Sequence, residues 1–202
     1  MKHLVLASAS PRRAELLRQI GLEFDVVISN APEDIPSGPL DPGKLVIDLA
    51  VAKVTQVARS LTEGIIIGAD TVVVSDNRVL GKPVSAKEAV AMLTALSGQK
   101  HRVFTGVAIA EASTGKLVTD YEMTEVKFHP LSPAAIQAYV NSGEPFDKAG
   151  AYGIQGLGAV LVERIEGCYF NVVGLPLSKL VRMLEGFGVS IWWEHYGEST
   201  YN

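Results

Sequence analysis

One continuous apolar run, IIIGAD at residues 65–70, constrains the fold of this chain more than any other stretch. A strand with one solvated face alternates apolar and polar residues, whereas this run is typical of a buried central strand. It is followed by VVVSDNRVL, residues 72–80, which predicts a hairpin turning at Asp76 and Asn77. A hairpin is not found in a purely parallel sheet, so we expect a mixed sheet.

Strand-like and helix-like segments alternate along the rest of the chain. Further strands are predicted at 3–7, 24–29, 101–111 and 117–128, with a further strand pair within 157–174. Helices are predicted at 10–20, 41–61, from the capping box SAKE (85–88) to just before Gly98, from Ser132 to near Gly143, and at 176–186. The Pro- and Gly-rich stretch 31–43 is expected to be a loop. The pattern indicates a mixed α/β fold.

Composition excludes several classes of protein. With 202 residues, 48% hydrophobic, the chain can bury a sizeable core, and its net charge of −4 argues against a protein that coats nucleic acid. Cys168 is the single cysteine, so no internal disulfide can form, and a thiolate zinc site is not expected. The first apolar run is too short for a secretory signal, and no stretch is long enough to span a membrane. We expect a cytoplasmic protein with no membrane or nucleic-acid partner.

The segment LVLASASPRRAELL, residues 4–17, carries two cations in an unusual place. Its proline is typical of a first helical residue, with Ser10 as the cap, so Arg12 and Arg13 fall in the first helical turn. A helix N-terminus favours anions, by roughly 0.3–1 kcal/mol per charge. Either both guanidinium groups are solvated, or they bind a phosphate together with free N–H groups and the hydroxyl groups of Ser8 and Ser10.

Two charged side chains interrupt apolar segments. Lys53 lies on a helical face otherwise made of aliphatic residues, and it either snorkels to solvent or brings its ammonium group into a pocket. Asp70 ends the apolar run, and in open α/β sheets ligands lie beyond the carboxyl ends of strands. Asp70 therefore either caps a turn, or holds a divalent cation or orients a water molecule.

Loops supply further charged and polar candidates. Glu33 and Asp34 in the 31–43 loop, and Lys82 in a GKP turn, are either solvated or part of the same site. In DKAGAYGIQGLG, residues 147–158, the glycines allow close approach of a ligand, and Tyr152 and Gln155 are expected to protrude. The amide of Gln155 can match the N3–H and a carbonyl of uracil or thymine, although many such loops are plain turns. Together these charges suit a polyphosphate and its divalent metal.

Familiar nucleotide and catalytic motifs are absent from the chain. Gly81-Lys82 is followed by proline rather than by the serine or threonine of a P-loop, and no G-x-G-x-x-G, H-E-x-x-H or G-x-S-x-G motif occurs. The four histidines, at 3, 101, 129 and 195, show no ligand spacing, so we expect structural or surface roles for them. Cys168 lies in a strand-like stretch and is expected to be a small core residue.

Five motifs, taken together, resemble the Maf family of nucleotide pyrophosphatases: ASASPRRAELL, GADTVVV, LGKP, ALSGQKHRVFTGVAI and DKAGAYGIQGLG. They occur in the family's order. The resemblance implies an elongated mixed β-sheet flanked by helices, related to the inosine-triphosphate pyrophosphatases. It implies one domain over 1–202, with two lobes, an active-site cleft between them and a C-terminal tail at 187–202. A homodimer is also implied, and Trp192 and Trp193 in the tail are expected to make packing or dimer contacts.

Site roles also follow from the resemblance. The family's substrate-binding residues fall on Ser8, Ser10, Arg12, Arg13, Lys53 and Lys82. Its catalytic aspartate falls on Asp70, which with Glu33 would hold Mg or Mn; whether Asp70 acts as a base or as a metal ligand stays open. At the specificity positions Arg12, Thr71 and Gln155 this chain resembles the dTTP- and UTP-hydrolysing branch. The branch acting on 7-methyl-GTP has Trp, Gln and Glu there, which suits a cationic base.

The resemblance implies hydrolysis of dTTP and UTP, nucleoside triphosphates, to the monophosphate and pyrophosphate. Such an enzyme would clear unwanted or modified pyrimidine nucleotides, and the family is also associated with arrest of septum formation. The alternative is a nucleotide-sensing regulator of septum formation without turnover.

Overall fold

The computed structural model of the protein describes residues 2–33 and 40–190, so the predictions for Asp34, Trp192, Trp193 and His195 lie outside it. Within the described ranges, seven strands form one sheet in the order β2-β1-β3-β5-β6-β7, with β4 paired to β3. The strands are β1 (Leu4–Leu6), β2 (Asp25–Val26), β3 (Ile65–Ser75), β4 (Arg78–Leu80), β5 (Lys100–Glu111), β6 (Leu117–Phe128) and β7 (Val162–Glu166). The predicted mixed α/β fold is confirmed.

Strand β3 is the centre of the sheet, as its apolar run predicts. It pairs in parallel with β1 and antiparallel with β5, so both edges are covered by neighbouring strands. The strand continues past residue 70 to Ser75 without a break, and the hairpin to β4 turns at Asp76 and Asn77. Both turn residues have positive φ, 48° and 60°, as a two-residue hairpin turn requires.

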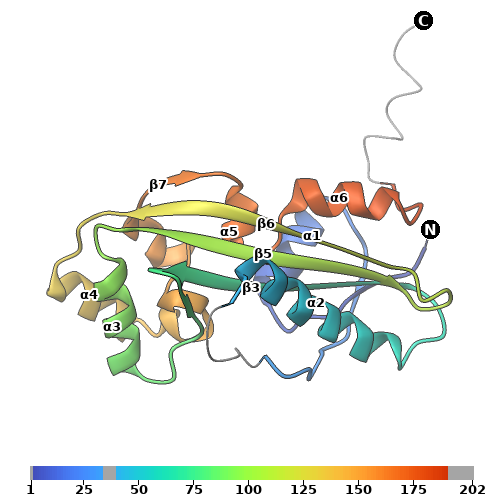
Figure 1. The fold of residues 1–202 in the computed structure, drawn as a ribbon, viewed down its shortest axis with the longest axis horizontal. Coiled ribbons are helices and arrows are strands. Elements are labelled where there is room, and N and C mark those ends of the chain that lie inside the picture. Colours follow the sequence, from blue (N-terminus) through green and yellow to red (C-terminus); the bar gives the residue numbers. More distant parts are fainter. Residues whose placement is uncertain (1, 34–39, 191–202) are drawn as a thin grey trace, which may run out of the picture.

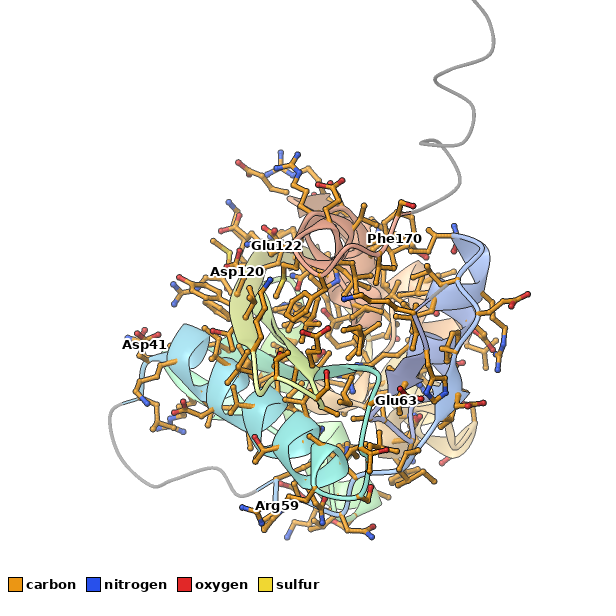
Figure 2. The ribbon with its side chains drawn as sticks, turned by 90° about the vertical axis from the view of Figure 1, so that its right-hand side faces the viewer. Asp41, Arg59, Glu63, Asp120, Glu122 and Phe170 are labelled. Carbon is orange, nitrogen blue, oxygen red and sulfur yellow. The ribbon has the colours of Figure 1, made fainter. Side chains whose placement is uncertain are left out.

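The helices cover both faces of this sheet. They are α1 (Pro11–Gln19), α2 (Pro42–Ala58), α3 (Ala86–Leu96), α4 (Pro133–Asn141), α5 (Tyr169–Val173) and α6 (Leu177–Glu185), with the short 3₁₀ helices η1 (Glu144–Asp147), η2 (Ala149–Ala151) and η3 (Gly156–Leu161). Successive side chains of β3 point to opposite faces: Ile65 and Ile67 pack against α1 and α6, and Ile66 packs against α2. Figure 2 shows α2, marked by Asp41 and Arg59, on one side of the sheet and α1 on the other.

Helix α2 lies unusually close to the two central strands because both have glycine beneath it. A methyl group on Gly106 of β5 would lie 2.2 Å from the carbonyl oxygen of Val46. One on Gly68 of β3 would lie 2.6 Å from a methyl group of Val54. Since side chains cannot overlap at these distances, the two glycines fix the height of α2 above the sheet. That height sets where Lys53 reaches.

The molecule is elongated along the long strands β5 and β6, with α3 and α4 at one end and α1 and α6 toward the other (Figure 1). Among the described residues, no helix is long and apolar enough to cross a membrane.

The prediction of a strand pair within 157–174 is wrong in its second half. Only Val162–Glu166 is a strand, while Tyr169–Val173 forms helix α5. The cause is tertiary: the buried Asn171 donates from Nδ2 to the carbonyl oxygen of Val103 and to Oγ1 of Thr124, and these bonds outweigh the β-propensity of the neighbouring side chains. Cys168 consequently stands at the N-cap position of this helix and is half-buried rather than part of the core. The strand predicted at 24–29 is shortened to the exposed pair Asp25–Val26.

Candidate active site

A cleft of about 400 Å³ opens beside the middle of β3, where the start of α1 meets loops from distant parts of the chain. All ten site residues predicted from the sequence line this one cleft: Ser8, Ser10, Arg12, Arg13, Glu33, Lys53, Asp70, Thr71, Lys82 and Gln155. They come from segments more than 140 positions apart in the chain, so the fold alone brings them together.

Arg13 is buried at the first turn of α1 and is held by three acceptors. Its Nε donates to the carbonyl oxygen of Gly174 at 2.8 Å, and its two terminal nitrogens donate to Oγ of Ser8 at 3.3 Å and Oγ1 of Thr71 at 3.1 Å. Burial lowers the pKa of Arg13, which reflects the cost of removing a cation from water. An anion in the cleft would offset that cost.

The hydroxyl group of Thr71 is part of a directed chain of hydrogen bonds. The buried Thr105 donates to the carbonyl oxygen of Asn171 at 3.0 Å, so the 2.9 Å contact between the two threonines has Thr71 as donor. Thr71 is then oriented to accept from Arg13. The hydroxyl of Thr71 thus helps to fix the guanidinium group, and α5, predicted as a strand, supplies the carbonyl group of Asn171 and, at its C-cap, that of Gly174.

The N-terminus of α1 is left free for a ligand. Ser10 occupies the cap position, as predicted, but its side chain makes no capping hydrogen bond. Instead the backbone N–H of Ser10 donates to Oγ of Ser8 at 3.1 Å. The first turn therefore presents uncapped N–H groups beside two guanidinium groups, an arrangement that suits phosphate oxygens.

Lys53 joins the two acidic residues of the cleft. Its ammonium group lies 2.5 Å from Oδ1 of Asp70 and 2.7 Å from Oε1 of Glu33, and the side chain is 7% exposed. The reading of Lys53 as a snorkelling surface residue is thereby excluded, because it points into the cleft from α2. Lys82 contacts the second oxygen of Glu33 at 2.8 Å, so the four side chains form one continuous ionic chain.

The ionic chain keeps Glu33 charged. Partial burial by itself raises the pKa of Glu33, but the hydrogen bonds and charges of Lys53 and Lys82 outweigh it and bring the pKa down to about 2. Both carboxylates that could hold a cation converge on the same ammonium group. Among the described residues no larger cluster of metal-ligating side chains occurs. Mg²⁺ characteristically uses one or two carboxylates together with substrate phosphates, so this donor set fits it.

Two cleft residues were missed from the sequence. Asp147 accepts from a terminal nitrogen of Arg12 at 2.8 Å and from Lys148 at 2.6 Å, which ties the start of α1 to η1. Both residues stand at the head of the glycine-rich motif, and an adjacent acid and base there were the available signal. The described part of the cleft is lined by five basic side chains and three acidic ones, although the whole chain is acidic.

The glycine-rich motif differs from the expectation at one of its two polar residues. Gln155 lies half-buried at the cleft wall, as predicted. Tyr152 does not protrude: it is 5% exposed, and its hydroxyl group lies 2.7 Å from Nε2 of the buried His101. Phe128 packs edge-on against both rings. A permissive backbone does not determine side-chain direction, and here an aromatic cluster draws the ring inward. His101 is structural, as predicted.

The chain is similar in sequence to known proteins. The family model described as Maf-like protein matches residues 3–187. A dTTP/UTP pyrophosphatase of Moorella thermoacetica is 52% identical over 192 residues, covering 95% of this chain and 98% of that protein. Proteins of the same name from Desulforamulus reducens and Acetivibrio thermocellus are each 50% identical, over 95% of this chain and 100% and 98% of theirs. A solved HAM1 protein of Coxiella burnetii is 16% identical, with a TM-score of 0.48 over 80% of this chain and 81% of that one.

Proposed function

Because the chain belongs to the Maf family, we propose that the cleft is the active site of a nucleoside triphosphate pyrophosphatase that hydrolyses dTTP and UTP to the monophosphate and pyrophosphate. The observation that carries this proposal is the buried Lys53, which holds Asp70 and Glu33 together in a cleft with an excess of basic side chains. Such a cleft supplies positive charge for a triphosphate and a carboxylate for the attacking water.

The cleft residues divide the work of phosphate-anhydride hydrolysis. Arg12, Arg13 and Lys82 neutralise the triphosphate, with the free N–H groups of α1 and the hydroxyl groups of Ser8 and Ser10 accommodating further oxygens. Asp70 takes a proton from the water that attacks the α-phosphorus. A bond forms between the water oxygen and this phosphorus as the bond to the bridging oxygen breaks, and pyrophosphate leaves. Lys53 orients Asp70 through the 2.5 Å contact.

A divalent cation, Mg or Mn, completes the proposed site. Glu33 and Asp70 are the residues that would hold it, and it would neutralise charge on the phosphate oxygens. Chelation of the cation should then stop turnover, and addition of Mg or Mn should restore it. Full hydrolysis of UTP and dTTP after exhaustive chelation would argue against this part of the proposal.

Base selection is assigned to Gln155, with Arg12 and Thr71 at the other specificity positions. An amide both donates and accepts, so Gln155 can pair with the N3–H and a carbonyl of uracil or thymine. Arg12 donates to Asp147 at the head of the glycine-rich motif, which supports a role for its guanidinium group near the base as well as near the phosphates. Thr71 acts through Arg13, whose terminal nitrogen donates a hydrogen bond to Oγ1 of Thr71.

The assembly and setting of the enzyme are proposals as well. We expect one domain whose two lobes share the sheet, with the cleft between them. We also expect a homodimer in solution, and measuring the molar mass of the purified protein by light scattering tests this. A single cysteine, Cys168, excludes an internal disulfide and fits a reducing compartment such as the cytoplasm.

The test of the function is a substrate panel. The purified protein with Mg is incubated with UTP, dTTP and GTP, and released pyrophosphate is measured by a colorimetric assay. UTP and dTTP should be hydrolysed with release of pyrophosphate and not of orthophosphate. Tight nucleotide binding without turnover would favour a nucleotide-sensing role instead.

A further inference from the structure

The loop that carries Gln155 is fastened from outside the cleft by one carboxylate. Glu144 of η1 accepts hydrogen bonds from the backbone N–H of Leu157 at 2.9 Å and of Gly158 at 3.1 Å. It also accepts from the hydroxyl group of Tyr139 at 2.9 Å. Neither Glu144 nor Tyr139 is among the residues that line the cleft, so both act on the loop from behind the cleft wall.

Tyr139 fastens the other end of the same loop. Its side chain, which is buried at the end of α4, uses its oxygen to accept from the backbone N–H of Gly153 at 3.2 Å. Gln155 therefore lies between two anchored points, Gly153 before it and Leu157 and Gly158 after it. The side chains that accept these hydrogen bonds both come from the short segment 139–144.

The loop packs so closely on these two side chains that glycine is required. A methyl group on Gly158 would lie 2.2 Å from the carbonyl oxygen of Gly153 and 2.6 Å from the hydroxyl oxygen of Tyr139, and one on Gly156 would lie 2.7 Å from Oε2 of Glu144. Gly156 also has φ of +65°, a conformation that glycine adopts without strain. The glycines of the motif thus let the loop close on itself at Gly153 and pack against Glu144 and Tyr139, and the hydrogen bonds to these two side chains fix the path of the backbone on both sides of Gln155.

A carboxylate is the side chain best suited to this task. Both of its oxygens accept, Oε1 from Tyr139 and Gly158 and Oε2 from Leu157, whereas an amide accepts at only one of its two terminal atoms and donates at the other. Burial alone raises the pKa of Glu144, but the N–H groups of Leu157 and Gly158, the hydroxyl of Tyr139 and the charge of Lys148 outweigh burial and lower it. The residue therefore stays charged near neutral pH.

We propose that Glu144, together with Tyr139, is a positioning residue for base selection: it holds the 153–158 loop so that the amide of Gln155 faces the pyrimidine. This inference rests on the proposed function, since it assigns the base to Gln155. It predicts that loss of the anchors weakens discrimination between bases while leaving the phosphate chemistry at Asp70 intact.

The test uses the full-length variants Glu144→Gln and Tyr139→Phe, with Glu163→Gln as the matched control. Glu163 is exposed on β7 and undergoes the same change of charge. Backbone hydrogen exchange is measured segment by segment, and kcat and KM are measured for UTP, dTTP and GTP. In Glu144→Gln, exchange in residues 153–158 should rise about tenfold, since a hydrogen bond to a charged acceptor is lost.

Selectivity for the base should change in the same variants in which hydrogen exchange of residues 153–158 changes. KM for UTP and dTTP should rise about three- to tenfold with kcat within about twofold, and the preference for UTP over GTP should fall by a similar factor. Tyr139→Phe should change the same quantities in the same direction, and Glu163→Gln should match the unmodified chain. Unchanged exchange in 153–158, or an equal loss of kcat for all three nucleotides, would overturn the proposal.

The two proposals can fail separately. An unmodified chain that releases no pyrophosphate contradicts the proposed function. In that case exchange in 153–158 and the binding of UTP against GTP, measured by calorimetry, still decide the role of Glu144.

Discussion

At the scale of single residues, the cleft is notable for charges that are buried in pairs. Removing a carboxylate or an ammonium group from water costs several kcal/mol unless a partner is present. Lys53 forms ion pairs with Asp70 and Glu33, which offset this cost. Among the described residues, by contrast, Arg13 donates hydrogen bonds only to uncharged oxygens. Arg13 is thus the cation most stabilised by an anionic ligand in the cleft. Asp70 is the carboxylate whose position is most firmly fixed for a role in catalysis.

Asp70→Asn tests the role of this carboxylate. The amide keeps the shape of the side chain but cannot take a proton from water, so kcat should fall by about 10²–10⁴-fold, the usual contribution of general-base catalysis. The dissociation constant for UTP, measured by calorimetry, should change only a few-fold because Arg12, Arg13 and Lys82 remain. Full pyrophosphate release by this variant would remove Asp70 from the mechanism.

Gln155→Glu tests base selection directly. The carboxylate can accept but not donate, so it loses the hydrogen bond to a carbonyl of the base and meets that oxygen with like partial charge. Loss of one such bond should lower kcat/KM for dTTP by roughly tenfold or more. The ratio of dTTP to GTP hydrolysis is the measurement, and an unchanged ratio would exclude Gln155 from specificity.

At the scale of elements, the sequence predicts most of the fold because most segments carry their own signals. The serine-led helix starts at 85 and 132, the hairpin at Asp76 and Asn77, and the apolar run of β3 all form where their local patterns indicate. Helix α5 does not, because its five residues are rich in strand-forming side chains and its helical form depends on Asn171, whose partners lie 47 and 68 positions away. No local pattern records such bonds.

Gly106→Ala tests how elements position the site. The added methyl group would lie 2.2 Å from the carbonyl oxygen of Val46, so α2 must move away from the sheet. Overpacking of this kind costs roughly 1–3 kcal/mol, which lowers Tm by about 2–12 °C in a chain of this length. Lys53 moves with α2, so kcat should fall as well.

A matched variant separates this effect from the addition of a methyl group in general. Gly186 has an ordinary helical conformation, and a methyl group on it would lie 3.3 Å from its nearest neighbour, the carbonyl oxygen of Met183. Gly186→Ala is therefore the matched variant. It should leave Tm and kcat nearly unchanged. A Gly106→Ala protein with unaltered Tm in a thermal melt would contradict the view that this glycine sets the height of α2.

At the scale of the whole molecule, the cleft is a product of topology rather than of any one motif. Residue types and spacing singled out Arg12, Arg13, Lys53 and Asp70 as candidates for one polyphosphate site, and the resemblance to a family supplied their separate roles. Distances such as that between Lys53 and Asp70 depend on α2 crossing β3 and β5, which local sequence does not encode. The same reason hides Glu144, because its two partners in the glycine-rich loop are backbone groups 13 and 14 positions further along the chain.

Global stability should depend on pH through His101, which lies in the aromatic cluster with Phe128 and Tyr152. Burial lowers the pKa of His101 from 6.5 to about 4. The unfolded chain therefore binds a proton at His101 between about pH 6.5 and 4 while the folded chain does not. Stability from this group is complete above pH 6.5 and is lost as the pH falls toward 4, by roughly 3 kcal/mol in all.

Urea unfolding at a series of pH values measures this dependence. The free energy of unfolding should decrease between pH 6.5 and 4, and His101→Gln should flatten that part of the curve, although it lowers stability at neutral pH by disturbing the contact with Tyr152. His129→Gln, at an exposed position, should leave the slope as it is. If the slope persists in His101→Gln, other groups carry the acid sensitivity, and the aromatic cluster is then only a packing element at the α3–α4 end of the sheet.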